Sequence, residues 1–266
     1  MVTSRRRNDR PSPSYRPGGH RPARGAHTSR STTPGDWLWG WHAVAAALEN
    51  PARAEPRRLL ATAERARALG ARFEPVLDIV EAAAISAALP QGAVHQGVAL
   101  DIPQLEPLTL SELATPASGV ILMLDQVTDP QNVGTIFRSA AAFGARGVVL
   151  QDRHAPALVG VLAKATAGAI DKIPHARETN LSRALERLDA LGWRAVGLDG
   201  EAPASLAETL DGRPTVLVVG SEGEGLRRLV REHCDALARI PMAGGFESLN
   251  VAAAAAVALY EATRAL

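Results

Sequence analysis

The chain has a single cysteine, few aromatic residues and no long apolar run. Cys234 alone excludes an internal disulfide and any metal site built from several cysteines. A lone cysteine is usually a small buried hydrophobe, with a catalytic thiol as the alternative. Glu261 and Arg264 interrupt the C-terminal apolar segment, so no stretch reaches membrane-spanning length. We therefore expect a soluble, cytoplasmic protein without a membrane partner.

The net charge of +1 conceals a strong asymmetry between the N-terminus and the rest of the chain. Residues 1–35 contain eight arginines and one acidic residue, Asp9, which leaves a net charge of −6 for the remainder. This segment is rich in Arg, Pro, Ser and Gly, a composition that predicts a disordered basic tail attracting RNA phosphates. An organellar transit peptide and a solvated tail without function are the alternatives.

The length of 266 residues favours two domains after the tail. Residues 36–103 alternate short helical and strand patterns and predict a small α/β domain: helices at 43–48, 63–69 and 79–89, and strands at 57–62 and 96–102. Residues 104–118 follow Pro103, contain Pro107 and Pro116, and predict a linker.

Residues 119–266 alternate apolar strands with helices, and the strands begin near residues 120, 147, 194, 215 and 236. Continuous apolar strands separated by helices are typical of an α/β fold with a parallel sheet covered on both faces. Ligands bind such sheets at the carboxyl ends of the strands. Three loops at these ends carry polar or glycine-rich motifs.

The first loop follows the strand that ends near Asp125. Asp129 and Pro130 predict a turn, and Asn132 is a candidate cap for the next helix. Arg138 lies six residues further on, where a guanidinium can clamp phosphate or ribose oxygens. A surface ion pair is the alternative role for Arg138.

The second loop, within residues 217–235, places Glu222 among three glycines that allow close approach of a ligand: Gly220, Gly223 and Gly225. It lacks the Lys-Ser/Thr of a phosphate-binding loop, and Glu222 and Glu224 would repel a phosphate. A cofactor without phosphate fits it better, with a plain turn as the alternative.

The third loop, residues 239–251, contains the polar cluster Glu247, Ser248 and Asn250 and leads into an alanine-rich segment. Ser248 is a candidate helix cap. Residues 251–259 carry no polar side chain, which predicts a helix buried nearly all round. A capped C-terminal core helix without a site is the alternative.

Three motifs carry a family resemblance in the same order: DPQNVGTIFRSAAAFGARGVVL, VVGSEGEGL and IPMAGGFESLNVAAAAAVALYEA. They resemble the motifs of the SpoU (TrmH-type) RNA ribose 2′-O-methyltransferases of the SPOUT superfamily, over residues 119–266. The region from Trp39 to Ile102 is similar to the L30e-type RNA-binding domain of the bacterial 23S rRNA guanosine methyltransferases. The basic tail has no place in this pattern.

The resemblance implies a trefoil-knotted parallel-sheet methyltransferase domain at 119–266, preceded by an L30e-like RNA substrate-binding domain at 36–103. It implies S-adenosylmethionine as the cofactor, bent in the knot, and no metal. Carried over by position, Gly220, Ile240 and Leu249 would contact this cofactor, and Met242 and Gly244 would help to line its pocket.

The same resemblance gives Arg138 the family's essential arginine, often assigned the deprotonation of the ribose 2′-hydroxyl. A guanidinium is a poor base, so we expect Arg138 to stabilise the developing oxyanion or to position phosphate. Asn132, Glu222, Ser248 and Asn250 would hold Arg138 and the target nucleotide in register.

The expected activity is methylation of a guanosine in 23S rRNA during rRNA processing, by a homodimer that packs through the catalytic domain. A tRNA substrate is one alternative. A non-catalytic RNA-binding ribosome-assembly factor is another, of a different class.

Overall fold

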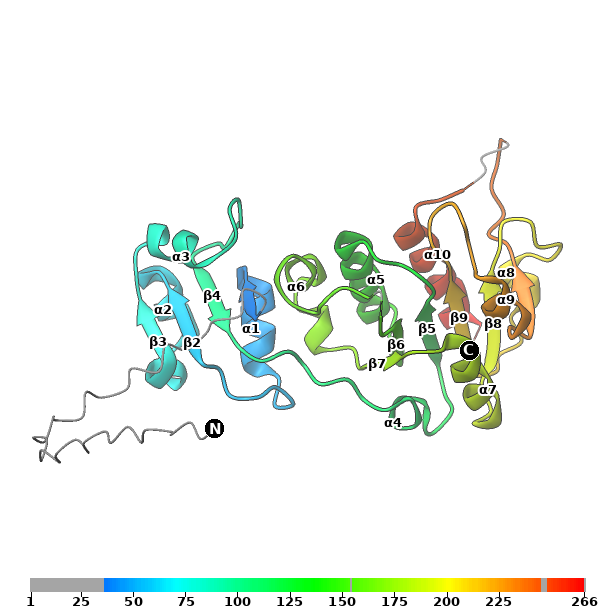
Figure 1. Ribbon diagram of the computed structural model, residues 1–266, viewed down its shortest axis with the longest axis horizontal. Helices are drawn as coiled ribbons and strands as arrows, with labels where there is room; N and C mark the ends of the chain where they lie inside the picture. Colours follow the sequence, from blue (N-terminus) through cyan, green and yellow to red (C-terminus); the bar gives the residue numbers. More distant parts are fainter. Residues whose placement is uncertain (1–35, 154, 245–247, 266) are drawn as a thin grey trace, which may run out of the picture. The chain divides into compact units, whose positions relative to one another are not determined.

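The computed structural model describes residues 36–153, 155–244 and 248–265 (Figure 1). The predicted basic tail, residues 1–35, lies outside the described residues, as does Glu247 of the third loop. None of the helices within the described ranges is long and apolar enough to cross a membrane.

The first part of the described chain forms a four-stranded sheet in the order β1-β4-β2-β3. Its β2 and β3 pair in parallel, whereas β4 is antiparallel to both β1 and β2. Buried side chains such as Leu38, Val44, Leu59 and Leu100 form its core. The elements are β1 (Trp37–Trp39), α1 (Trp41–Glu49), β2 (Arg58–Ala61), α2 (Ala63–Leu69), η1 (Ala71–Val76), β3 (Leu77–Ile79), α3 (Ala82–Ala88) and β4 (Val98–Asp101).

One sequence prediction in this region is wrong. The helical pattern expected over residues 79–89 divides into the end of strand β3 and the shorter helix α3. β3 is an edge strand, and 63% of the Ile79 side chain is exposed. A short edge strand carries no continuous apolar run, which explains why periodicity did not identify it.

The segment expected as a linker, residues 104–118, is partly ordered against the second sheet. It contains helix α4 (Leu110–Ala114), which begins with a capping box between Thr109 and Glu112. Leu110, Leu113 and Ala114 are buried in a core cluster, and Trp193 donates from its indole nitrogen to the Ala114 carbonyl at 2.9 Å. The division into domains at 36–103, 104–118 and 119–266 stays a prediction.

The second part forms a six-stranded sheet in the order β10-β8-β9-β5-β6-β7, with every neighbouring pair parallel. This confirms the predicted α/β class with a parallel sheet. The strands are β5 (Val120–Leu124), β6 (Gly147–Gln151), β7 (His175–Glu178), β8 (Arg194–Leu198), β9 (Thr215–Val219) and β10 (Ala236–Ala238). The trefoil knot stays a prediction, because strand order alone does not define how the chain is threaded, and the L30e-like assignment also stays one.

Helices cover both faces of this sheet (Figure 1). One core cluster joins the sheet to helices α5, α6 and α10, and the other joins it to α4, α7 and α9. The helical segments after α4 are α5 (Pro130–Ala142), α6 (Gly160–Thr166), η2 (Ala169–Asp171), α7 (Leu181–Ala190), α8 (Leu206–Thr209), α9 (Arg228–Glu232) and α10 (Val251–Arg264). Strand β7 was missed from sequence because its residues, His-Ala-Arg-Glu, include two charged side chains.

Helix α10 is not buried nearly all round, so that expectation is wrong. Its Ala255, Ala258 and Leu259 are fully buried, but 44% of Val257 and 49% of Tyr260 are exposed. Alanine fits a buried or an exposed helix face equally well, and an alanine-rich sequence therefore does not show which face is covered.

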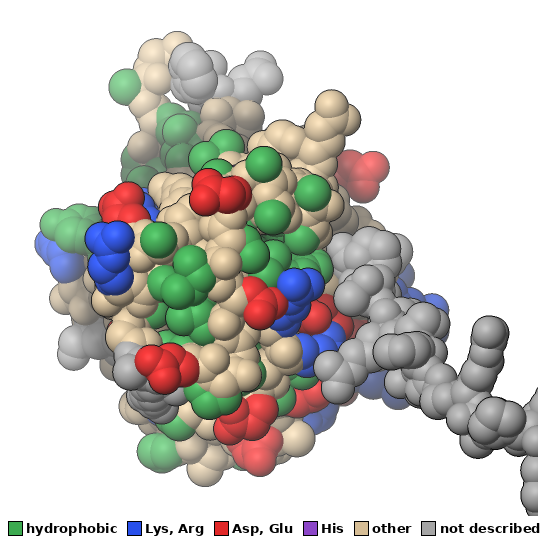
Figure 2. Space-filling model, turned by 90° about the vertical axis from the view of Figure 1, so that its left-hand side faces the viewer, with side chains coloured by type: hydrophobic (Ala, Val, Ile, Leu, Met, Phe, Trp, Pro, Cys, Tyr) green, Lys and Arg blue, Asp and Glu red, His purple; other side chains and the backbone are tan. Residues whose placement is uncertain are grey.

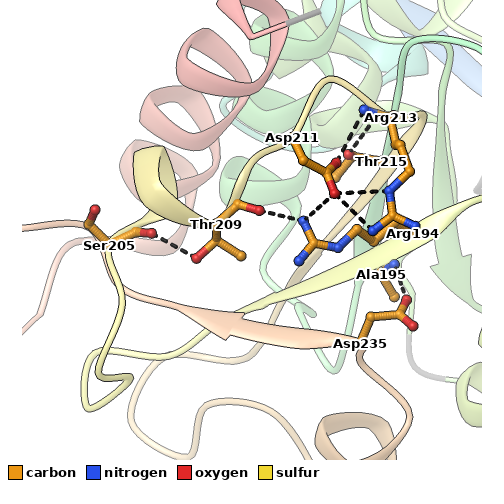
Figure 3. Close-up of polar contacts among 8 residues, drawn as sticks. All are labelled: Arg194, Ala195, Ser205, Thr209, Asp211, Arg213, Thr215 and Asp235. Carbon is orange, nitrogen blue, oxygen red and sulfur yellow. Dashed lines mark hydrogen bonds and ion pairs between the residues drawn. The ribbon is translucent and has the colours of Figure 1, made fainter.

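Polar side chains form hydrogen bonds and ion pairs at the amino ends of β8 and β9 (Figure 3). Asp211 accepts from the Arg213 Nε at 2.9 Å and pairs with Arg194 at 3.4 Å. Asp235, which precedes β10, accepts from the Ala195 amide at 2.7 Å. These polar groups at the amino ends of the strands are therefore paired, and the cavity described below lies at the opposite, carboxyl edge of the sheet.

Candidate functional site

A cavity of about 810 Å³ lies at the carboxyl ends of β8 and β9. A volume of this size is typical of small-molecule sites, and this edge of a parallel sheet is where such sites form. Among the predicted cofactor residues, four line the cavity: Gly220, Ile240, Met242 and Leu249. Three predicted polar residues also line it: Glu222, Ser248 and Asn250. Gly244 does not line it, and its predicted role stays a prediction.

The second-motif loop folds back tightly at the cavity wall. Ser221 and Gly225 face each other as an antiparallel bridge, and the Gly225 amide donates to the Ser221 carbonyl at 3.1 Å. A Cβ at Gly220 would lie 2.2 Å from the Gly225 carbonyl carbon, a distance that no side chain tolerates. The sequence therefore needs glycine at position 220 to close this loop.

The carboxylate of Glu222 joins all three motif loops. Its Oε1 accepts from the Asn250 Nδ2 at 2.7 Å, from the Asn132 Nδ2 at 3.2 Å and from the Val251 amide at 3.2 Å. Asn250 also donates to the Asn132 Oδ1 at 3.0 Å. Within the described part of the chain, Oε2 of Glu222 has no hydrogen-bond partner, so it can accept from a ligand.

Both helix caps differ from the sequence predictions. Asp129, not Asn132, caps α5, because its carboxylate accepts from the amides of Gln131 and Asn132. Asn250, not Ser248, caps α10 by accepting from the amides of Ala252 and Ala253. The Asn132 side chain is thereby available to Glu222, and the Ser248 side chain is available to the cavity.

Arg138 lies apart from this constellation. It is exposed on α5, it does not line the cavity, and it forms no hydrogen bond or ion pair with any described residue. No described carboxylate supports the alternative of a surface ion pair. A guanidinium without a carboxylate partner is free to meet an anionic group from outside the chain.

Sequence reasoning missed a fourth segment, which follows β8. Asp199, Gly200 and Glu201 line the cavity beside the second-motif loop. Asp199 accepts from the Glu201 amide at 2.9 Å and pairs with Arg231 at 2.9 Å. The sequence held part of the signal, because Asp199 and Gly200 directly follow an apolar strand, but it did not reveal that this strand, β8, lies beside β9.

An ion pair with a buried carboxylate fixes the base of the second-motif loop. The Asp125 side chain is fully buried at the end of β5 and accepts from the Arg227 amide at 2.8 Å and its Nε at 2.7 Å.

Burial, with the nearby carboxylates of Asp235 and Asp125, raises the pKa of the Cys234 thiol to about 12. The thiol is therefore neutral near pH 7, and the alternative of a catalytic thiol is wrong.

Comparison with known proteins identifies the family. Residues 119–260 match the SpoU rRNA Methylase family. The chain belongs to this family. The six-stranded parallel sheet described above is thus the fold of a SpoU-family chain.

Individual SpoU relatives support this assignment. An uncharacterized tRNA/rRNA methyltransferase of Mycolicibacterium smegmatis is 44% identical over 176 residues, which cover 64% of this chain and 56% of that protein. The chain thus spans little more than half the length of such curated relatives. The AdoMet-bound rRNA methyltransferase of Sinorhizobium meliloti is similar with a TM-score of 0.75 and 28% identity, covering 88% of both chains. The AdoMet complex of AviRb from Streptomyces viridochromogenes gives a TM-score of 0.72 and 25% identity, covering 90% of this chain and 93% of that one.

The pair between Asp125 and Arg227 predicts that substitutions of two neighbouring arginines change stability unequally. Arg227→Ala should lower the free energy of unfolding by about 2 kcal/mol, because it leaves the buried Asp125 carboxylate without its charged partner. Arg228→Ala removes an exposed pair with Glu232 and should cost less than about 0.5 kcal/mol. Urea unfolding of both variants measures this difference, and equal losses would contradict the role given to Asp125.

Proposed function

We propose that this chain transfers a methyl group from S-adenosylmethionine to a ribose 2′-hydroxyl in RNA. The observation that carries the proposal is the Glu222 carboxylate, which joins three SpoU motif loops at the rim of a cavity. Such an arrangement places a cofactor pocket beside a cluster of fixed polar groups, as a group-transfer site requires.

The cavity fits the proposed cofactor in shape and charge. Ile240, Met242 and Leu249 offer apolar contacts for an adenine ring, and Gly220 allows close approach of the backbone. Glu201 and Glu222 would repel a phosphate but suit a cofactor that carries positive charge on sulfur and nitrogen. Two similar SpoU structures hold AdoMet, which supports the same choice here. When bound, this cofactor supplies the electrophilic methyl group.

The polar residues have distinct proposed roles toward the RNA. The free Oε2 of Glu222 and the Ser248 hydroxyl can bond to ribose oxygens, while Asn132 and Asn250 fix the Glu222 carboxylate. Arg138 is proposed to stabilise negative charge on the 2′-oxygen or to hold an adjacent phosphate. It is not proposed as a base, because a guanidinium stays protonated near neutral pH.

A homodimer accounts for the position of Arg138. Phe143, which directly follows α5, makes an edge-on contact with Tyr260 of α10, with ring centroids 5.8 Å apart. Val257 and Tyr260 are exposed on α10, and Arg138 is exposed on the adjoining α5. A second copy seated on this face would cover the apolar side chains and bring each Arg138 toward the partner's cavity, in an isologous arrangement.

The proposed substrate is a guanosine of 23S rRNA. The likeness to the rRNA methyltransferase of S. meliloti covers 88% of this chain, so it extends over both the four-stranded and the six-stranded sheet. Methyl transfer to 23S rRNA and tRNA transcripts, compared side by side with labelled S-adenosylmethionine, separates this substrate from the tRNA alternative. Cofactor binding without methylation of either RNA would contradict the proposed activity and favour a non-catalytic RNA-binding role.

Replacing Arg138 tests the proposed chemistry. Arg138→Ala should lower the methyl-transfer rate by about 100-fold or more, because it removes a preorganised positive charge. Its affinity for S-adenosylmethionine should stay within about twofold of wild type, since Arg138 does not line the cavity. Arg183→Ala, at an exposed position on α7, is the matched control and should retain full activity. Unchanged turnover in Arg138→Ala would refute the assignment.

A charge on the exposed face of α10 tests the proposed dimer. Tyr260→Glu should convert a dimer into monomers in sedimentation experiments, because it places a carboxylate in the apolar contact. Leu229→Glu alters a side chain on α9 with similar exposure, 50% against 49%, and should leave the mass unchanged. A wild-type protein that sediments as a monomer would overturn the dimer proposal.

A further inference from the structure

Arg65, on helix α2 of the four-stranded sheet, has a guanidinium that is held in place without a carboxylate. Its Nε donates to the Gln96 carbonyl at 3.0 Å, and its Cζ lies 4.9 Å from the centroid of the Trp41 ring. Neither of its terminal nitrogens forms a hydrogen bond with a described residue. The side chain is therefore fixed at one end and keeps its terminal donors free.

Three other arginines around this sheet are paired with carboxylates. Arg57 pairs with Asp36 and Asp101, Arg58 pairs with Asp78, and Arg53 forms a buried pair with Asp171. On the face drawn in Figure 2, basic side chains likewise stand among acidic ones. Of the arginine side chains described in residues 36–103, only Arg65 and the exposed Arg67 lack a carboxylate partner.

The loop that holds the Arg65 side chain contains a residue in an unfavourable backbone conformation. Gln96 has a φ of 55°, which is unfavourable for a residue with a side chain, and its Oε1 accepts from the Trp41 amide at 3.0 Å. Gly97 follows with a φ of 80°, and a Cβ there would lie 3.1 Å from the Arg65 Cγ. Strain of this kind persists only where surrounding contacts enforce it, and it is concentrated at binding and catalytic sites.

We propose that Arg65 is a docking group for the RNA substrate. The N–H groups on its two terminal nitrogens donate hydrogen bonds to a pair of acceptors on one RNA loop. This inference rests on the proposed function, because it assumes an RNA substrate. Two neighbouring phosphate oxygens and the O6 and N7 of a guanine both match a planar guanidinium fork. The ring of Trp41 and the Gln96 carbonyl set the plane of the fork before RNA arrives, so little side-chain freedom is lost on binding.

Binding of a 23S rRNA transcript to the full chain, followed by fluorescence anisotropy, tests this role. Arg65→Ala should weaken binding about tenfold, the effect expected for loss of one bidentate contact. Arg65→Lys should weaken it similarly, because an ammonium keeps the charge but not the planar fork. Arg67→Ala, two residues further along α2, should change affinity by less than about twofold. All three variants should bind S-adenosylmethionine as wild type does, which shows that the six-stranded sheet and its cavity are intact.

The salt dependence of binding separates the two kinds of acceptor. Loss of a phosphate contact reduces the slope of log affinity against log salt concentration by about one. Loss of a base contact leaves this slope unchanged and relaxes the preference for RNA sequence. Either result supports docking by Arg65. Wild-type affinity in Arg65→Ala would overturn the inference, and wild-type affinity in Arg65→Lys would overturn the planar contact. Failure of the wild-type chain to bind or methylate RNA would instead overturn the proposed function beneath it.

Discussion

One carboxylate oxygen, Oε1 of Glu222, is the point on which the site depends. It accepts from two asparagine side chains and from the first amide of α10, and each of these donors belongs to the first or third motif loop. The loops come from segments about 90 and 28 residues away in the chain. An anionic acceptor at a helix N-terminus suits this task, since the helix dipole favours negative charge there. The shape of the cavity rim follows from these three bonds.

Much of the fold could be predicted because buried parallel strands are continuous apolar runs. β5 and β9 are buried at every residue, and their motifs stand directly after them, which placed Gly220 and Glu222 at the cavity. Strands with mixed composition, such as β7, gave no comparable signal. Helix caps were also misassigned, because Asp129 and Asn132, or Ser248 and Asn250, are equally good caps by residue type and only the backbone geometry distinguishes them.

The remaining features depend on contacts between distant segments. Asp199 and Glu201 reach the cavity because β8 lies beside β9, a neighbourhood that the order of the sequence does not reveal. The exposure of Val257 and Tyr260 follows from which face of α10 packs on α5 and the sheet. Arg65 gains its distinct position only through Trp41 and Gln96, which are 24 and 31 residues away along the chain. The hydrophobic pattern and the composition of the sequence do not predict such contacts between distant segments.

The central claim is that Glu222 holds the three motif loops in a geometry competent for methyl transfer. The most direct test is the single-turnover rate of methyl transfer to RNA by Glu222→Ala, compared with Glu224→Ala in the same exposed loop. Loss of the shared acceptor should lower the rate by about 100-fold, because a displacement of about 1 Å at a reacting centre has an effect of that size. Glu224→Ala should react as wild type does. Equal rates in the two variants would contradict the account.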